Sequence, residues 1–168
     1  MANFNQAFKC TLKFEGGYSD HPLDRGGKTK YGITEKVARA EGWMGSMNDL
    51  PLVIAKKIYE RNYWNKLNLN NIDEQYIATE LFDTAVNCGV RTSGKFFQKA
   101  INLISAYYVT VDGIIGDKTI DIYNRLNTWE KKIMLKCLNG LQFEYYHNIV
   151  RRLNPKMKIF FKGWLKRV

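Results

Sequence analysis

Apolar residues recur along most of the chain at the spacing of an α-helix. Near the start, Phe4, Phe8 and Leu12 follow one another at intervals of four, which places them on one face of a helix. The pair Gly16–Gly17 ends this pattern, because glycine adopts the left-handed conformation that closes many helices. We therefore predict a first helix from about Phe4 to about Glu15.

The same spacing predicts further helices over the rest of the chain. They begin after Thr34, after Pro51, near Ile77, near Thr92, after Gly116 and at Thr128, and a last short one ends at Trp164. Between Tyr18 and Thr34 the pattern gives way to glycine, aspartate and short polar residues, which is typical of turns. The expected fold is mainly α, with a small glycine-rich loop or β-hairpin after the first helix.

Composition excludes several classes of protein. The 168 residues are 45% hydrophobic and 14% aromatic, which is enough to bury a core and too apolar for a disordered chain. Cys10, Cys88 and Cys137 are odd in number and form no CxxC pair, which argues against a disulfide scaffold and against a zinc site. We expect three reduced thiols in the core, no metal and no cofactor.

The first residues contain no apolar stretch long enough for the core of a signal peptide, and no 18-residue apolar run occurs anywhere. We expect synthesis in the cytoplasm without a signal peptide. A role outside the cytoplasm would then require release by another agent.

Positive charge is concentrated in the second part of the chain. The formal net charge is +10, and residues 1–96 carry 13 basic and 11 acidic side chains against 13 and 5 in residues 97–168. After Glu144 there is no acidic residue, and the basic ones are Arg151, Arg152, Lys156, Lys158, Lys162, Lys166 and Arg167. This asymmetry favours a polyanionic partner, such as nucleic acid, an anionic membrane or an anionic cell wall, although a basic surface that only aids solubility fits it equally.

Glu15 is a candidate proton donor. Its spacing from Leu12 and Phe4 places the carboxyl on the apolar face, at the end of the first helix. Loss of hydration and the negative end of the helix dipole would both raise its pKa. A plain surface glutamate at a helix end is the alternative reading.

Five segments occur in a characteristic order: Glu15–Tyr18, Asp24–Thr34, Phe82–Gly89, Asp112–Thr119 and Gly163–Arg167. The first three resemble the EGGY, D-x-GG-x-T-x-x-GIT and FD-x-AVN-x-G segments of the glycoside hydrolase family 108 lysozymes. The last two resemble the DG-x-x-G-x-x-T and GW-x-x-R signatures of the predicted peptidoglycan-binding domain that usually follows. One departure is Arg25, where the family usually has proline, and we expect it to alter loop rigidity more than activity.

The resemblance implies a lysozyme-like helical fold, with a catalytic region at 1–96 and a basic peptidoglycan-binding region at 97–168 packed against it. It also implies a muramidase that cleaves the β-1,4 bond between N-acetylmuramic acid and N-acetylglucosamine. Glu15 would be the general acid. Asp24 would hold water or stabilise the developing positive charge, with Thr29 as a water-orienting hydroxyl and Asp20 as a rival carboxylate.

A sugar-binding cleft requires aromatic faces and amide groups. Tyr18, Tyr31 and Trp64 are candidates for the first and Asn87 for the second, although Trp64 is equally well explained as a core residue. Asp83, between apolar neighbours on a predicted helix, is read as a structural hydrogen-bonding partner.

The expected partners are peptidoglycan glycan strands and, through the basic region, anionic polymers of the cell envelope. We expect a monomer and no nucleic-acid ligand, since no recognition motif accompanies the charge. A phage or prophage endolysin is the favoured biological setting, and a secreted effector muramidase or a non-catalytic wall-binding protein is the alternative.

Overall fold

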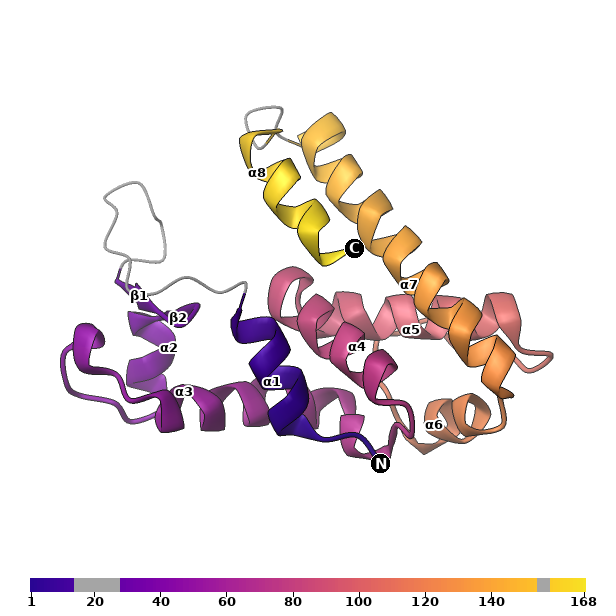
Figure 1. Ribbon diagram of the computed structural model, residues 1–168, viewed down its shortest axis with the longest axis horizontal. Helices are drawn as coiled ribbons and strands as arrows, with labels where there is room; N and C mark the ends of the chain where they lie inside the picture. Colours follow the sequence, from indigo (N-terminus) through magenta and orange to yellow (C-terminus); the bar gives the residue numbers. More distant parts are fainter. Residues whose placement is uncertain (14–27, 154–157) are drawn as a thin grey trace.

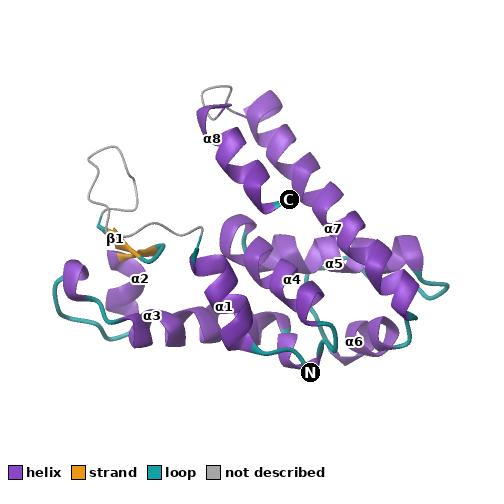
Figure 2. Ribbon diagram, viewed as in Figure 1, coloured by secondary structure: helices purple, strands orange, loops and turns teal. Residues whose placement is uncertain are grey.

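The computed structural model describes residues 1–13, 28–153 and 158–168, and these are mainly helical (Figures 1 and 2). The first half holds α1 (Phe4–Leu12), α2 (Glu35–Ala40), α3 (Leu52–Tyr59) and α4 (Gln75–Cys88). The second half holds α5 (Val90–Ile104), α6 (Asp117–Asn124), α7 (Thr128–Asn148) and α8 (Lys158–Trp164). A two-stranded hairpin, β1 (Thr29–Lys30) and β2 (Ile33–Thr34), precedes α2. The mainly α fold with a small hairpin is confirmed.

Helix α1 begins at the residue that the sequence predicts. The Asn3 side chain accepts a hydrogen bond from the Gln6 amide and caps the helix. The Asn3 amide donates to the Gln75 side chain at 2.6 Å, so a residue at the start of α4 completes the cap. The predicted end of this helix at Glu15 lies outside the described residues.

The core is one cluster of apolar side chains that extends through both halves of the chain. Helix α1 packs along α4, α4 packs along α5, and α5 packs along α7. The ring of Phe4 meets the ring of Phe82 edge-on at 5.7 Å, and Phe97 meets Tyr123 at 5.2 Å. The expected boundary between residues 96 and 97 falls inside α5, so it does not mark a break between separate folded units.

The second half is organised around α5 and α7. A capping box of Asn127 and Glu130 starts α7. A wider π-helix at Ile149–Leu153 follows the last turn of α7. Helix α8 returns along the end of α7, where Trp164 stacks on Tyr146 with ring centroids 5.2 Å apart. Trp164 is therefore a packing residue.

The three cysteines are free thiols. Cys88 and Cys137 are half-buried, and burial raises the pKa of the Cys88 thiol to about 11. Cys10 is exposed on α1, so the expectation that it lies in the core is wrong. In the described parts of the chain, none of the helices is both long enough and apolar enough to span a membrane.

Candidate active site

The elements that carry the candidate residues end on one side of the molecule. In Figure 1 the end of α1, the hairpin, the end of α4 and the C-terminus lie along the upper side, away from the N-terminus. Glu15, Tyr18, Asp24 and the rival Asp20 lie outside the described residues. The described residues stop at Lys13, directly after α1, and resume at Lys28, next to β1.

The hairpin holds Thr29 and Tyr31. Thr29 is half-buried in β1 and is paired across the hairpin with Thr34. Tyr31 and Gly32 form the tight turn with φ of 52° and 72°, the left-handed pair that a two-residue hairpin of this kind requires. The Tyr59 hydroxyl donates to the Tyr31 carbonyl at 2.8 Å and ties the turn to α3.

The Tyr31 ring is half-buried and packs against the core, with the Lys30 ammonium 5.2 Å from its centroid. Lys30 also donates to the carbonyl of Asn48. The ring therefore has a fixed position beside a cation, and its role as a platform for a sugar stays a prediction.

Trp64 belongs to the core. Its exposed fraction is 0%, its rings lie 5.6 Å from Phe4 and 5.8 Å from Phe82, and its indole N–H donates to Asn70 at 2.7 Å. A fully buried ring presents no face to a ligand. The structure therefore corrects the assignment of Trp64 to substrate binding and supports the core reading.

Asn87 is exposed near the end of α4 and is held by Asp83, one turn earlier. Its amide nitrogen donates to the Asp83 carbonyl at 2.8 Å and to the Asp83 carboxylate at 3.2 Å. The other carboxylate oxygen accepts from Arg167 at 2.8 Å. Asp83 therefore has the structural hydrogen-bonding role that its position predicts, but its partner Arg167 was not among the predicted site residues.

Glu80 is a second residue that sequence reasoning missed. It lines a pocket of about 120 Å³ between α1, α4 and the last turn of the chain, together with Thr11, Asp83, Lys166 and Arg167. Burial raises the pKa of Glu80 to about 7, the charge of Asp83 adds to the shift, and a hydrogen bond from Thr84 opposes it. Its spacing of three and four residues from Asp83 and Thr84 was the available signal, because it places all three on one helix face.

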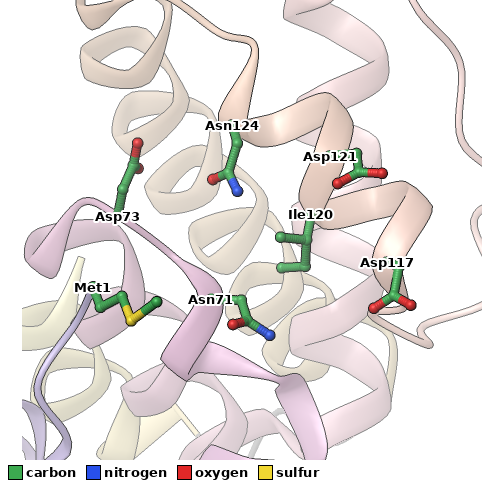
Figure 3. Close-up of a pocket in the computed structure, with 7 residues that line it drawn as sticks. All are labelled: Met1, Asn71, Asp73, Asp117, Ile120, Asp121 and Asn124. Carbon is green, nitrogen blue, oxygen red and sulfur yellow. The ribbon is translucent and has the colours of Figure 1, made fainter.

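A second pocket, of about 380 Å³, lies at the opposite side near the N-terminus (Figure 3). Its three carboxylates come from the turn before α4 (Asp73) and from α6 (Asp117 and Asp121), and Figure 3 shows that they do not converge on one point. Asp73 is paired with the Lys131 ammonium. In the described parts of the chain, no three His, Cys, Asp or Glu residues are placed to hold a metal ion.

Two parts of the chain are similar to known protein families. Residues 8–89, which include the second half of α1, the hairpin and α4, match the family model of Glycosyl hydrolase 108. Residues 8–89 therefore resemble a glycosyl hydrolase 108 domain. Residues 93–168 match the Predicted Peptidoglycan domain, so a glycosyl hydrolase 108 domain is followed by a peptidoglycan-binding one. Together the two domains imply peptidoglycan hydrolysis.

A solved structure described as that of Brucella abortus SagA is similar over almost the whole of this chain. The TM-score is 0.76 at 28% sequence identity, over 98% of this chain and 88% of the other. No curated protein matches the chain in sequence. The fold of this chain is therefore shared with a known structure over 98% of its length.

Proposed function

We propose that this protein is a muramidase that cleaves the β-1,4 bond between N-acetylmuramic acid and N-acetylglucosamine, with Glu15 as the general acid. The observation that carries the proposal is the glycosyl hydrolase 108 match over residues 8–89, which includes Glu15, Asp24 and Thr29. The attached peptidoglycan domain supports the choice of substrate.

The chemistry requires two groups on opposite faces of the scissile bond. Glu15 protonates the leaving oxygen, while Asp24 activates water or stabilises the oxocarbenium-like transition state. Thr29 orients the water from the first strand of the hairpin. A separation of about 5–5.5 Å between the carboxyls would give retention, and about 6.5–9.5 Å would give inversion.

Purified peptidoglycan tests the proposal directly. The wild-type protein should reduce turbidity and release fragments with muramic acid at the reducing end, as identified by mass spectrometry. Glu15→Gln should lower the rate by about 10²-fold or more with folding intact, because proton donation is lost. Glu60→Gln, at an exposed position beyond α3, is the matched control and should retain the wild-type rate.

Each other result has a definite reading. Unchanged cleavage in Glu15→Gln would exclude Glu15 as the acid. Pelleting with the wall without release of reducing ends would favour the non-catalytic wall-binding protein. Salt-sensitive binding to DNA that is tighter than binding to the wall would favour a nucleic-acid-binding protein.

We further propose that the enzyme reaches the wall after release from the cytoplasm, as a phage endolysin does. Its predicted peptidoglycan domain supports action on the wall. Expression in the bacterial cytoplasm should leave cells intact until a membrane pore is formed by a co-expressed holin. Export and lysis without a pore would favour the secreted effector.

A further inference from the structure

The last turn of the chain is anchored in the first domain by a buried ion pair. The Arg167 guanidinium donates to the Asp83 carboxylate at 2.8 Å, across 84 positions in the sequence. The two side chains are only 8% and 11% exposed. A charge in such a place is costly unless its partner is present, so this pair holds the end of the second domain against α4. Figure 1 shows the C-terminus beside the end of α4.

The same carboxylate fixes the orientation of Asn87. One oxygen of Asp83 faces Arg167, and the other, with the Asp83 backbone carbonyl, faces the Asn87 side chain. A carboxylate and a carbonyl only accept hydrogen bonds, so the amide nitrogen of Asn87 must face them. The carbonyl oxygen of Asn87 is then the end of the amide left for a ligand, and Asn87 is exposed.

We propose that Arg167 is a positioning residue for substrate binding: through Asp83 it holds Asn87 with its carbonyl oxygen toward the hydroxyl or N-acetamido N–H of a peptidoglycan sugar. The proposal rests on the muramidase function proposed above. In this arrangement the second domain completes the sugar-binding surface of the first, in addition to attaching the enzyme to the wall.

Removing the guanidinium should weaken the contacts that orient the Asn87 amide. Burial raises the pKa of Asp83, and the charge of Arg167 opposes that rise. Without Arg167, protonation of Asp83 is favoured. A protonated carboxyl can donate as well as accept, so one of the two acceptors that orient the Asn87 amide is weakened, and only the Asp83 backbone carbonyl still requires the amide nitrogen to face it. The less fixed orientation of Asn87 should weaken sugar binding and leave the chemical step unaffected.

Steady-state kinetics on soluble peptidoglycan fragments test this coupling, because wall attachment does not contribute there. Asn87→Ala should raise KM about tenfold, the value of one hydrogen bond to the substrate, and Arg167→Gln should raise KM by up to that factor, with little change in kcat in either variant. The double variant should be no worse than Asn87→Ala alone, within about twofold. Lys132→Gln, which removes an exposed positive charge from α7, should behave as the wild type.

A second readout does not depend on activity. The side-chain amide signals of Asn87 in a ¹⁵N-labelled protein, assigned by their loss in Asn87→Ala, should shift in Arg167→Gln and stay in place in Lys132→Gln. If Arg167→Gln does not fold, Arg167→Lys provides a second test. It keeps a cation but loses the fork geometry, so it should shift the same signals and raise KM by about threefold.

Additive effects in the double variant, or unchanged Asn87 signals and KM in a folded Arg167 variant, would overturn the positioning role. The proposed function fails separately, if the wild-type protein releases no fragments from peptidoglycan. In that case the Asn87 amide signals still decide whether Arg167 controls the orientation of Asn87.

Discussion

At the scale of single residues, Glu80 has a carboxyl whose pKa is raised when the protein folds. It lies on α4 against α1 and the last turn of the chain, with the acidic Asp83 and the basic Lys166 and Arg167 around the same pocket. Burial is the main cause of its raised pKa, about 7 against an ordinary value of 4.5. The folded protein therefore holds a proton there that the unfolded chain loses at lower pH.

This difference predicts that wild-type stability falls as pH rises from about 4.5 to about 7, because only the unfolded state has then released its proton. Glu80→Gln removes the penalty and keeps an oxygen for Thr84. It should unfold like the wild type at pH 4 and be more stable by up to about 3 kcal/mol at pH 8, as measured by urea denaturation. Equal stability gains at both pH values would contradict a titrating Glu80, and Glu60→Gln should show no pH-dependent difference.

Residue types and spacing indicate which residues carry polar chemistry, but not which of them face solvent. Trp64 follows an aromatic pattern that suits a sugar platform, yet its ring fills the space between α1 and α4. Asp83 is read correctly as a structural residue because its neighbours on the helix are apolar. Its partner Arg167 could not be predicted, because local periodicity carries no information about a contact 84 positions away.

At the scale of elements, the helices follow from apolar periodicity and end signals, and their positions agree with the sequence prediction. Their docking depends on contacts that the pattern does not contain. The turn at Asp112–Gly113 docks on α5 through Gln98, whose amide nitrogen donates to Asp112 at 2.8 Å and whose oxygen accepts from the Gly113 amide at 2.7 Å. The DG segment, which the sequence presents as part of a peptidoglycan-domain signature, therefore also attaches this turn to α5.

The backbones of α5 and the Asp112–Gly113 turn lie so close together that Gly94 is hard to replace. A Cβ at Gly94 would lie 2.4 Å from the carbonyl oxygen of Gly113, so α5 and the turn would have to separate. Gly94→Ala should lower the free energy of unfolding by about 1–3 kcal/mol in urea denaturation. Gly140→Ala on α7 meets no atom within 4 Å and should instead stabilise by up to about 1 kcal/mol, because alanine favours the helix. A stabilised Gly94→Ala would show that the contact between α5 and the Asp112–Gly113 turn tolerates a side chain.

At the scale of the whole molecule, the two sequence regions share one core but differ in charge. The apolar cluster includes Phe4 and Leu138, and the Asp83–Arg167 pair joins the two domains at a second place. The positive excess of residues 97–168 is carried in part by the exposed Arg151, Lys158 and Lys162, at the end of α7 and on α8. Figure 1 shows that the end of α7 and α8 project away from the other helices, so an extended polyanion could reach this part of the molecule.

Neutralising Arg151, Lys158 and Lys162 together to Gln should therefore weaken attachment to anionic envelope polymers and leave the sugar chemistry intact. Lysis of whole cells should fall about tenfold or more at low salt, since each lost charge near an anionic surface is worth roughly 1 kcal/mol. The difference from the wild type should shrink at 0.5 M salt, where the screening length is only about 4 Å. Hydrolysis of soluble fragments should stay within about twofold.

A triple variant of the first domain, Lys9, Lys36 and Lys57 to Gln, removes the same charge from other exposed positions and should lose less lysis. Equal losses on cells and on soluble fragments, or equal losses in the two triple variants, would show that the basic end has no special role in attachment.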